Sequence, residues 1–128
     1  MIVAGLGFRQ GVQAAEVELA LDCALQSLGP AASALRCLAV PLRKAEEPAA
    51  SFVARARGIE LMLIPQAALE AAAARTVSRS VHALRAMNVP SVAEAAAIAA
   101  AGSRARLLVP RVVRGSVTCA LAEGDGTP

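Results

Sequence analysis

The chain has no tryptophan or tyrosine, only two phenylalanines and a single histidine among its 128 residues. Proteins that hold single-stranded nucleic acid stack bases on aromatic side chains and follow the backbone with clustered basic residues. Here the 13 basic residues are spread along the chain and the net charge is only +3, so we expect no nucleic-acid partner. Because the three cysteines form no CxxC pair and one histidine cannot complete a zinc site, we expect no metal site.

Long apolar runs are also missing, although hydrophobic residues make up 56% of the chain. The longest runs are interrupted by Glu94 or Arg111, whereas a membrane-spanning helix needs about 20 apolar residues. Residues 1–7 carry no basic leader and no cleavage pattern, so we expect no secretory signal and a mature protein that starts at Met1. The odd number of widely spaced cysteines fits a reducing compartment. These features predict a cytoplasmic protein without a membrane partner.

The length fits one domain, which we place at residues 1–122, followed by a loose tail at residues 123–128. Strand-like apolar runs alternate with helical patterns in the first part of the chain. The strands are expected at 1–7, 35–42 and 59–64, and the helices at 13–28, 48–58 and 66–75. This βαβαβα order is typical of a parallel sheet covered by helices.

Two further strand-like runs, 107–113 and 116–121, flank Arg114-Gly115 and predict an antiparallel hairpin with Pro110 at a bulge or an edge. The sequence thus predicts an α/β fold, a three-layer α/β/α sandwich. Its sheet is expected to be mixed and mostly parallel, with about five strands, and to end in the hairpin.

The remaining segments carry weaker patterns. Residues 76–88 predict a loop with a helical turn or two, in which His82 has a structural role. The segment Ser91 to Glu94 matches a capping box, so a helix should start there and run to about Gly102. The helix that begins at Pro48 is expected to bury Phe52, Val53 and Ala56.

A glycine pattern, GxGxxxG, stands at the first strand-to-helix turn, at Gly5, Gly7 and Gly11. Such a turn is either purely structural or an anion-binding loop whose free amides face a ligand, and the neighbouring Arg9 favours binding. The dinucleotide fingerprint requires a glycine where Gln10 stands and an acidic residue where basic ones follow the second strand. We therefore expect neither NAD nor another cofactor.

Lys44 is the only lysine, and it follows the second predicted strand at the end where open α/β sheets bind ligands. It is either a compact, titratable charge at a binding site or a solvated charge paired with Glu46 or Glu47. Glu94 fits a capping carboxylate better than a catalytic one. Neither Ser80 nor Ser91 has a base nearby in the sequence, so a serine nucleophile is not expected.

Several of these segments together resemble one family over nearly the whole chain. GLGFRQG at residues 5–11 is similar to the opening GxGxRxG of the CobE/CbiG carboxy-terminal domain family of cobalamin biosynthesis. KAEEP at 44–48 resembles its K-x-[DE]-E segment. Ser80 and VPSVAEAAA at 89–97 resemble its serine and its G-V-x-S-V-A-E-A-A-A stretch, and VTCALA at 117–122 resembles its closing strand. The SVAEAAA segment is the most specific part.

The chain departs from the family pattern at three positions and in length. Asn88 stands where a glycine is usual, Arg111 where a lysine is common, and Phe8 where many members have a cysteine. The longer CbiG-type members carry additional amino-terminal domains, and the resemblance implies that they open the lactone of a cobalt-precorrin and release acetaldehyde. The short members are associated with the oxygen-dependent route.

The resemblance implies a protein that binds a precorrin or hydrogenobyrinic-acid-type intermediate, as a carrier or chaperone that can also meet other enzymes of the pathway. Acetate and propionate groups on such a ring suit arginine, lysine and loop amides, and an alanine-rich lining is expected around the ring. The ligand-binding candidates are Gly5, Gly7, Arg9, Gly11, Lys44, Ser80, Ser91 and Glu94.

Two alternatives stay open. The first is a precorrin lactone-opening hydrolase, in which Lys44 polarises the carbonyl and Glu47 or Glu94 activates water. The second is a nucleotide-phosphate binding module that uses the glycine loop alone.

Overall fold

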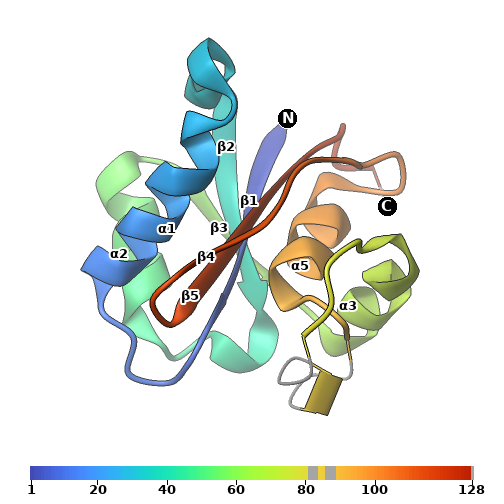
Figure 1. Ribbon diagram of the computed structural model, residues 1–128, viewed down its shortest axis with the longest axis horizontal. Coiled ribbons are helices and arrows are strands. Elements are labelled where there is room, and N and C mark those ends of the chain that lie inside the picture. The colour runs from blue at the N-terminus through green and yellow to red at the C-terminus, as the bar shows by residue number, and fades with distance from the viewer. Residues whose placement is uncertain (81–83, 86–88, 128) are drawn as a thin grey trace.

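The structure, a computed structural model, describes residues 1–80, 84–85 and 89–127. It contains a five-stranded sheet with helices packed on both faces, which confirms the predicted three-layer α/β fold (Figure 1). His82 and Asn88, which figured in the sequence analysis, lie outside the described residues.

The sheet has the strand order β3-β2-β1-β5-β4. Its strands are β1 (Ile2–Phe8), β2 (Leu35–Pro41), β3 (Glu60–Ile64), β4 (Arg106–Arg114) and β5 (Val117–Glu123). The pairs β1–β2 and β2–β3 are parallel, and β5 is antiparallel to both of its neighbours. Four strands therefore run in one direction and β5 runs against them, as the expected mixed, mostly parallel sheet requires.

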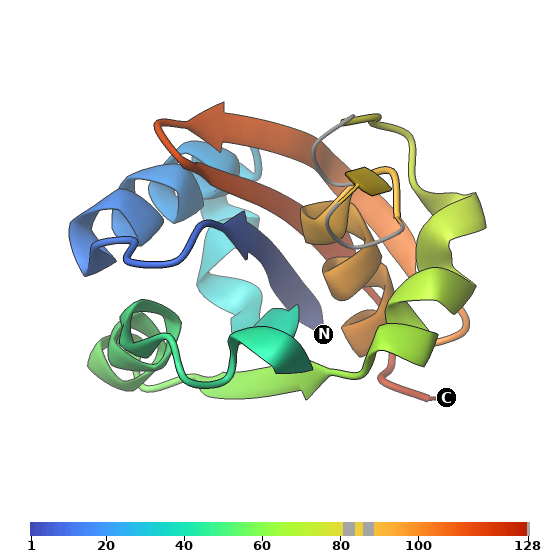
Figure 2. The ribbon, with the colours of Figure 1, turned by 90° about the horizontal axis from the view of Figure 1, so that it is seen from below.

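The helices divide between the two faces of the sheet (Figures 1 and 2). On one face lie α1 (Ala14–Gln26) and α2 (Pro48–Arg57), and on the other α3 (Gln66–Ala72) and α5 (Val92–Ala101). Short 3-10 helices lie at Gly29–Ala34, Leu42–Lys44 and Ala73–Arg75. Each face buries its own apolar cluster, so the two cores are separated by the sheet.

Seven of the ten residues of α5 are alanine, and the helix is buried around most of its circumference. Small side chains let it approach β1 closely at Gly5. A Cβ added to Gly5 would lie 2.0 Å from the carbonyl oxygen of Ala93 and 2.6 Å from the amide nitrogen of Ala97. Gly5 therefore serves helix-to-strand packing.

The buried face of α2 differs from the expected one. Val53 is buried as predicted, but Phe52 is 65% exposed and Ala56 is exposed as well. The residues packed against the sheet are Ala49, Ala50, Val53 and Ala54. Because successive helical residues are rotated by about 100°, a face centred on these four leaves Phe52 and Ala56 turned to solvent.

Arg57, in the last turn of α2, joins the two helices of its face. Its guanidinium bonds Glu18 of α1 at 2.7 Å and Asp22 at 2.6 Å. Hydrogen bonding to Glu18 raises the pKa of Arg57, burial opposes this rise, and the bond to Asp22 adds to it.

We expect Arg57→Ala to lower the free energy of unfolding by only about 1 kcal/mol, because water screens this partly exposed network. The reduction should diminish when urea unfolding is repeated in high salt. A loss that is independent of salt would show that the network acts through packing and not through charge.

The hairpin and the chain end complete the fold. The turn consists of Gly115 and Ser116, one residue later than predicted, and the register of β4 against β5 shifts between Val109 and Val112, which places Pro110 in the predicted irregularity. The last described residues, expected to be loose, form main-chain hydrogen bonds. The Gly126 amide donates to the Ala101 carbonyl, the Gly124 amide to the Met1 carbonyl, and the Ser103 amide to the Thr127 carbonyl. In the described part of the chain, no helix combines the length and apolar character needed to cross a membrane.

Candidate functional site

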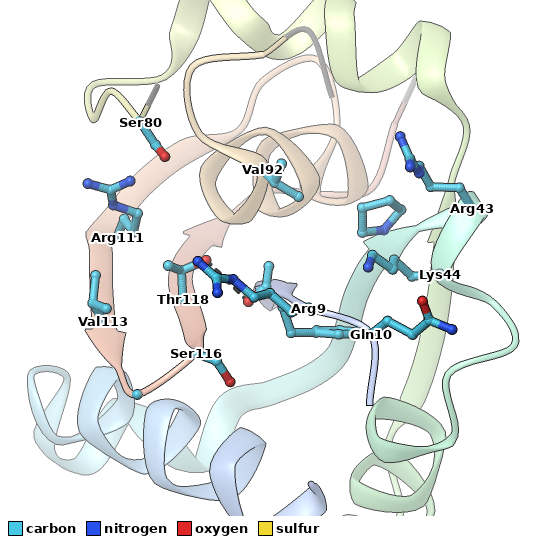
Figure 3. A pocket seen from close by; sticks show the side chains of 14 residues that line it. Arg9, Gln10, Arg43, Lys44, Ser80, Val92, Arg111, Val113, Ser116 and Thr118 are labelled. Atoms are coloured by element: carbon cyan, nitrogen blue, oxygen red, sulfur yellow. Dashed lines mark hydrogen bonds between the residues drawn. The ribbon is translucent and has the colours of Figure 1, made fainter. Parts of the chain in front are cut away.

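A cavity of about 490 Å³ opens where β1 and β2 end and where the β4–β5 hairpin turns (Figure 3). Phe8, Pro41, Val92 and Val113 give it apolar walls. Binding sites for small molecules commonly have volumes of about 300–1,000 Å³ and few polar groups on apolar walls, so this one is large enough for part of a sizeable ligand.

The topology explains the position of the cavity. From β1 the chain builds the sheet outward through β2 to β3, and then it crosses to β4 at the opposite edge. Where the direction of winding reverses, the loops after neighbouring strands diverge and leave a crevice at the carboxyl ends of the strands. Arg9 and Gln10 follow β1, and Arg43 and Lys44 follow β2, so both loops reach this crevice.

Four of the residues that line the cavity are cationic: Arg9, Arg43, Lys44 and Arg111. The Lys44 ammonium lies 5.7 Å from the centre of the Phe8 ring, and it forms no salt bridge with Glu46 or Glu47. Within the described ranges no carboxylate lines the cavity. Ligand anions would therefore meet positive charge without competition from an acidic side chain.

Two carboxylates brace the cavity wall from outside. Glu47 accepts a hydrogen bond from the Gly11 amide at 3.1 Å, which links the loop after β1 to the start of α2. Glu16, in the first turn of α1, accepts one from the Ser116 hydroxyl at 2.6 Å and holds the hairpin turn. Both acids are thus joined to the segments that carry lining residues.

Glu94 is the third bracing carboxylate, and its side chain is fully buried. One oxygen accepts from the amides of Val77 (2.7 Å) and Ser78 (2.9 Å), and the other accepts from the amide of Arg111 (2.9 Å). Burial alone would raise the pKa of Glu94, but the hydrogen bonds from Arg111, Ser78 and Val77 outweigh it, so the pKa is lowered.

The capping box predicted at the start of α5 is only half formed. The Ser91 hydroxyl accepts from the Glu94 amide at 3.4 Å, as expected. The Glu94 carboxylate, however, turns away from the helix start to bond the three amides, so the reciprocal half of the prediction was wrong. The competing partners are main-chain amides on two segments that fold against α5.

The structure brings together Gly7, Arg9, Lys44 and Ser80, all of which line the cavity. The other candidates lie outside the lining: Gly5 packs against α5, Gly11 and Glu47 bond each other, Ser91 caps α5 and Glu94 is buried beneath the wall. The anion-binding amide expected at Gly11 is thus already used by Glu47. No alanine is among the described lining residues, so the expected alanine-rich lining was wrong.

Sequence reasoning missed several lining residues. Arg43 precedes Lys44 at the same strand end, so the argument that predicts Lys44 also applies to Arg43. Arg111 and Thr118 come from the hairpin, and they reach the cavity because β5 pairs with β1. That pairing joins segments more than 100 residues apart, which no local pattern reveals.

No cysteine is among the described residues that line the cavity. Burial raises the pKa of Cys37 to about 11, with a further rise from Glu60, and burial raises the pKa of Cys119 to about 12. A thiol with such a pKa is a poor nucleophile at neutral pH. In the described part of the chain, no group of three or more histidine, cysteine or acidic side chains is placed to hold a metal ion.

Almost the whole chain matches a known protein family. Residues 2–122 match the family described as cobalamin synthesis G C-terminus. A curated relative, protein CobE from Sinorhizobium sp., is 35% identical over 121 residues, which span 94% of this chain and 79% of that protein.

Two solved structures have the same fold. The crystal structure of CobE, a protein from the cobalamin (vitamin B12) biosynthetic pathway, is 32% identical and superposes with a TM-score of 0.88, over 95% of this chain and 89% of that one. The cobalamin biosynthesis protein chiG from Agrobacterium tumefaciens str. C58 is 33% identical with a TM-score of 0.75, over 98% and 99% of the two chains.

Proposed function

The chain belongs to the CobE/CbiG carboxy-terminal family and is a cobalamin biosynthesis protein, and on that premise we propose that it binds a precorrin or related corrinoid intermediate as a carrier. Such a ligand is a tetrapyrrole ring with acetate and propionate groups around its edge. The carrier role would protect a labile intermediate or pass it between enzymes of the oxygen-dependent route.

The observation that carries this proposal is the charge of the cavity. Arg9, Arg43, Lys44 and Arg111 line it together with four apolar side chains, and the described lining includes no acid. Guanidinium groups pair with carboxylates through two parallel hydrogen bonds, and an ammonium adds a compact charge. Apolar walls with a cationic rim match a macrocycle whose edge carries carboxylates.

Binding without turnover agrees better with the site than lactone hydrolysis does. Hydrolysis needs a base within hydrogen-bond reach of an attacking water. Neither Glu47 nor Glu94 lines the cavity, and the carboxylate of Glu94 is occupied by three amides. The nucleotide-phosphate alternative relies on loop amides at the start of α1, and the Gly11 amide there is bonded to Glu47.

The test is co-elution of the purified protein with hydrogenobyrinic acid on a sizing column, followed by a spectral titration. We expect the pigment to travel with the protein and its visible bands to shift. Replacing Arg9 and Lys44 together with glutamine should weaken binding about 10- to 100-fold, because two charge-assisted contacts are lost.

Arg55→Gln is the matched control, because Arg55 is an exposed cation of α2 that does not line the cavity. It removes one positive charge and should leave the affinity within about twofold of the native value. A pigment that elutes apart from the native protein would overturn the proposal. Release of acetaldehyde during the incubation would favour the hydrolase instead.

A further inference from the structure

The cations of the cavity lie on two sides of it. In Figure 3, Arg43 and Lys44 lie on one side, Arg111 on the other, and Arg9 between them. Arg43 and Lys44 follow β2, Arg111 belongs to β4, and the strands β1 and β5 lie between these two. Three strand spacings of about 4.8 Å separate β2 from β4 by about 14 Å. A ligand that contacts the cations on both sides must therefore carry hydrogen-bond acceptors on two well-separated edges of the same molecule.

Three of the four cations that line the cavity have no ion-pair partner among the described residues. Arg9, Lys44 and Arg111 form no salt bridge with any residue in the described ranges. The acids that brace the wall are bonded to other groups: Glu16 to the Ser116 hydroxyl, Glu47 to the Gly11 amide, and Glu94 to three main-chain amides. A bound molecule that brings no negative charge would bury cations without compensation, which is unfavourable.

Whether the ligand binds therefore depends on whether its edge groups are carboxylates or amides. When a carboxylate and an ammonium ion condense to an amide and water, one negative charge disappears and one acceptor oxygen is replaced by an NH2 donor. The shape of the side chain hardly changes. Arginine and lysine side chains are donors only, so the new NH2 group would face other donors and the charge-assisted bond would be lost.

We propose, on the basis of the function proposed above, that the cavity selects the free-acid form of its tetrapyrrole and discriminates against the form with amidated edge groups. The protein then binds its ligand before the reactions that amidate the periphery of the ring. Amidation is accordingly the class of reaction that consumes the free-acid form, and the amidated product would bind this site only weakly.

The experiment compares hydrogenobyrinic acid with a sample of the same corrinoid whose edge carboxylates have been converted to amides with a carbodiimide and ammonium chloride. Spectral titration of the full chain at low salt should show binding of the amide sample that is weaker by about 30-fold or more. The difference should narrow as salt is raised, because mobile ions screen the charge-dependent part of the affinity.

Single variants on the two sides test the proposed geometry. Lys44→Gln and Arg111→Gln should each reduce the ratio of affinities between acid and amide, because each removes a cation that recognises charge on one edge. The control Arg55→Gln should leave that ratio unchanged. Equal affinities of the native protein for acid and amide would overturn the inference but leave the carrier function intact. Failure of both samples to bind would instead overturn the function on which the inference rests.

Discussion

Glu94→Gln should lower the free energy of unfolding by about 2–4 kcal/mol at neutral pH, a large part of the stability of a small protein. The carboxylate is fully buried and accepts three main-chain hydrogen bonds from two segments of the chain. An amide of the same shape can keep at most one oxygen as acceptor, so at least one buried N–H group would face an NH2 group.

The pH dependence of this loss follows from the lowered pKa of Glu94. Because the folded protein holds the carboxylate in its charged form, its contribution to stability is fully present above the ordinary pKa of 4.5. It is lost as the pH falls below 4.5 and through the lower pKa of the folded state. The native protein should therefore lose stability with acid more steeply than Glu94→Gln, and the two urea midpoints should converge.

The control is Glu46→Gln, at an exposed carboxylate two residues after Lys44. Urea unfolding from neutral to acidic pH should show a change within about 0.5 kcal/mol for this variant. Equal stability of Glu94→Gln and the native protein at neutral pH would contradict the assigned role. A gap that persists unchanged at acidic pH would show that packing, and not the charge of Glu94, is responsible.

Glu94 also illustrates the limit of sequence reasoning. The Ser-x-x-Glu spacing correctly predicted where α5 begins. The partners of the carboxylate, however, are main-chain amides 16 and 17 residues away on either side, and a main-chain amide has no residue type that a pattern could detect. A buried acid was thus interpreted as part of a local motif when it joins separate segments.

In the fold, too, features set by local sequence were predictable, and features set by contacts between distant segments were not. Glycines and prolines marked the ends of helices well, as at Gly58, whose positive φ of 67° ends α2. Apolar periodicity predicted the strands and the hairpin. It placed Phe52 in the core wrongly, because the buried face of α2 is formed by Ala49, Ala50, Val53 and Ala54 and leaves Phe52 exposed.

Lining residues of the cavity could be predicted from sequence where they directly follow a predicted strand. Lys44 was predicted because ligands bind at the carboxyl ends of parallel strands, and Arg9 because it neighbours the glycine turn after the first strand. Both line the cavity. Arg111 and Thr118 depend on how the hairpin pairs with β1, so their contribution required the three-dimensional structure. The roles of all these residues in ligand binding remain predictions.

Gly5→Ala should be the most damaging single methyl addition in the protein, with a loss of about 3 kcal/mol or more in the free energy of unfolding. The new Cβ would lie 2.0 Å from the Ala93 oxygen and 2.6 Å from the Ala97 nitrogen. Both are main-chain atoms of α5, so no side-chain rotation relieves the overlap. The helix itself must move away from β1, and it would lose contact with the core of that face.

Two comparison variants separate this explanation from a general sensitivity of glycine. Gly11→Ala meets no atom within 4 Å, so its cost should be only the strain of a φ of 82°, about 1–2 kcal/mol. Adding Ala97→Gly to Gly5→Ala should not restore stability, because that change removes a methyl group 2.9 Å from the new Cβ but leaves the main-chain atoms in place. Thermal and urea unfolding of the three variants measure these differences. Recovery of native stability in the double variant would show that the alanine side chains, and not the backbone of α5, set the distance between helix and strand.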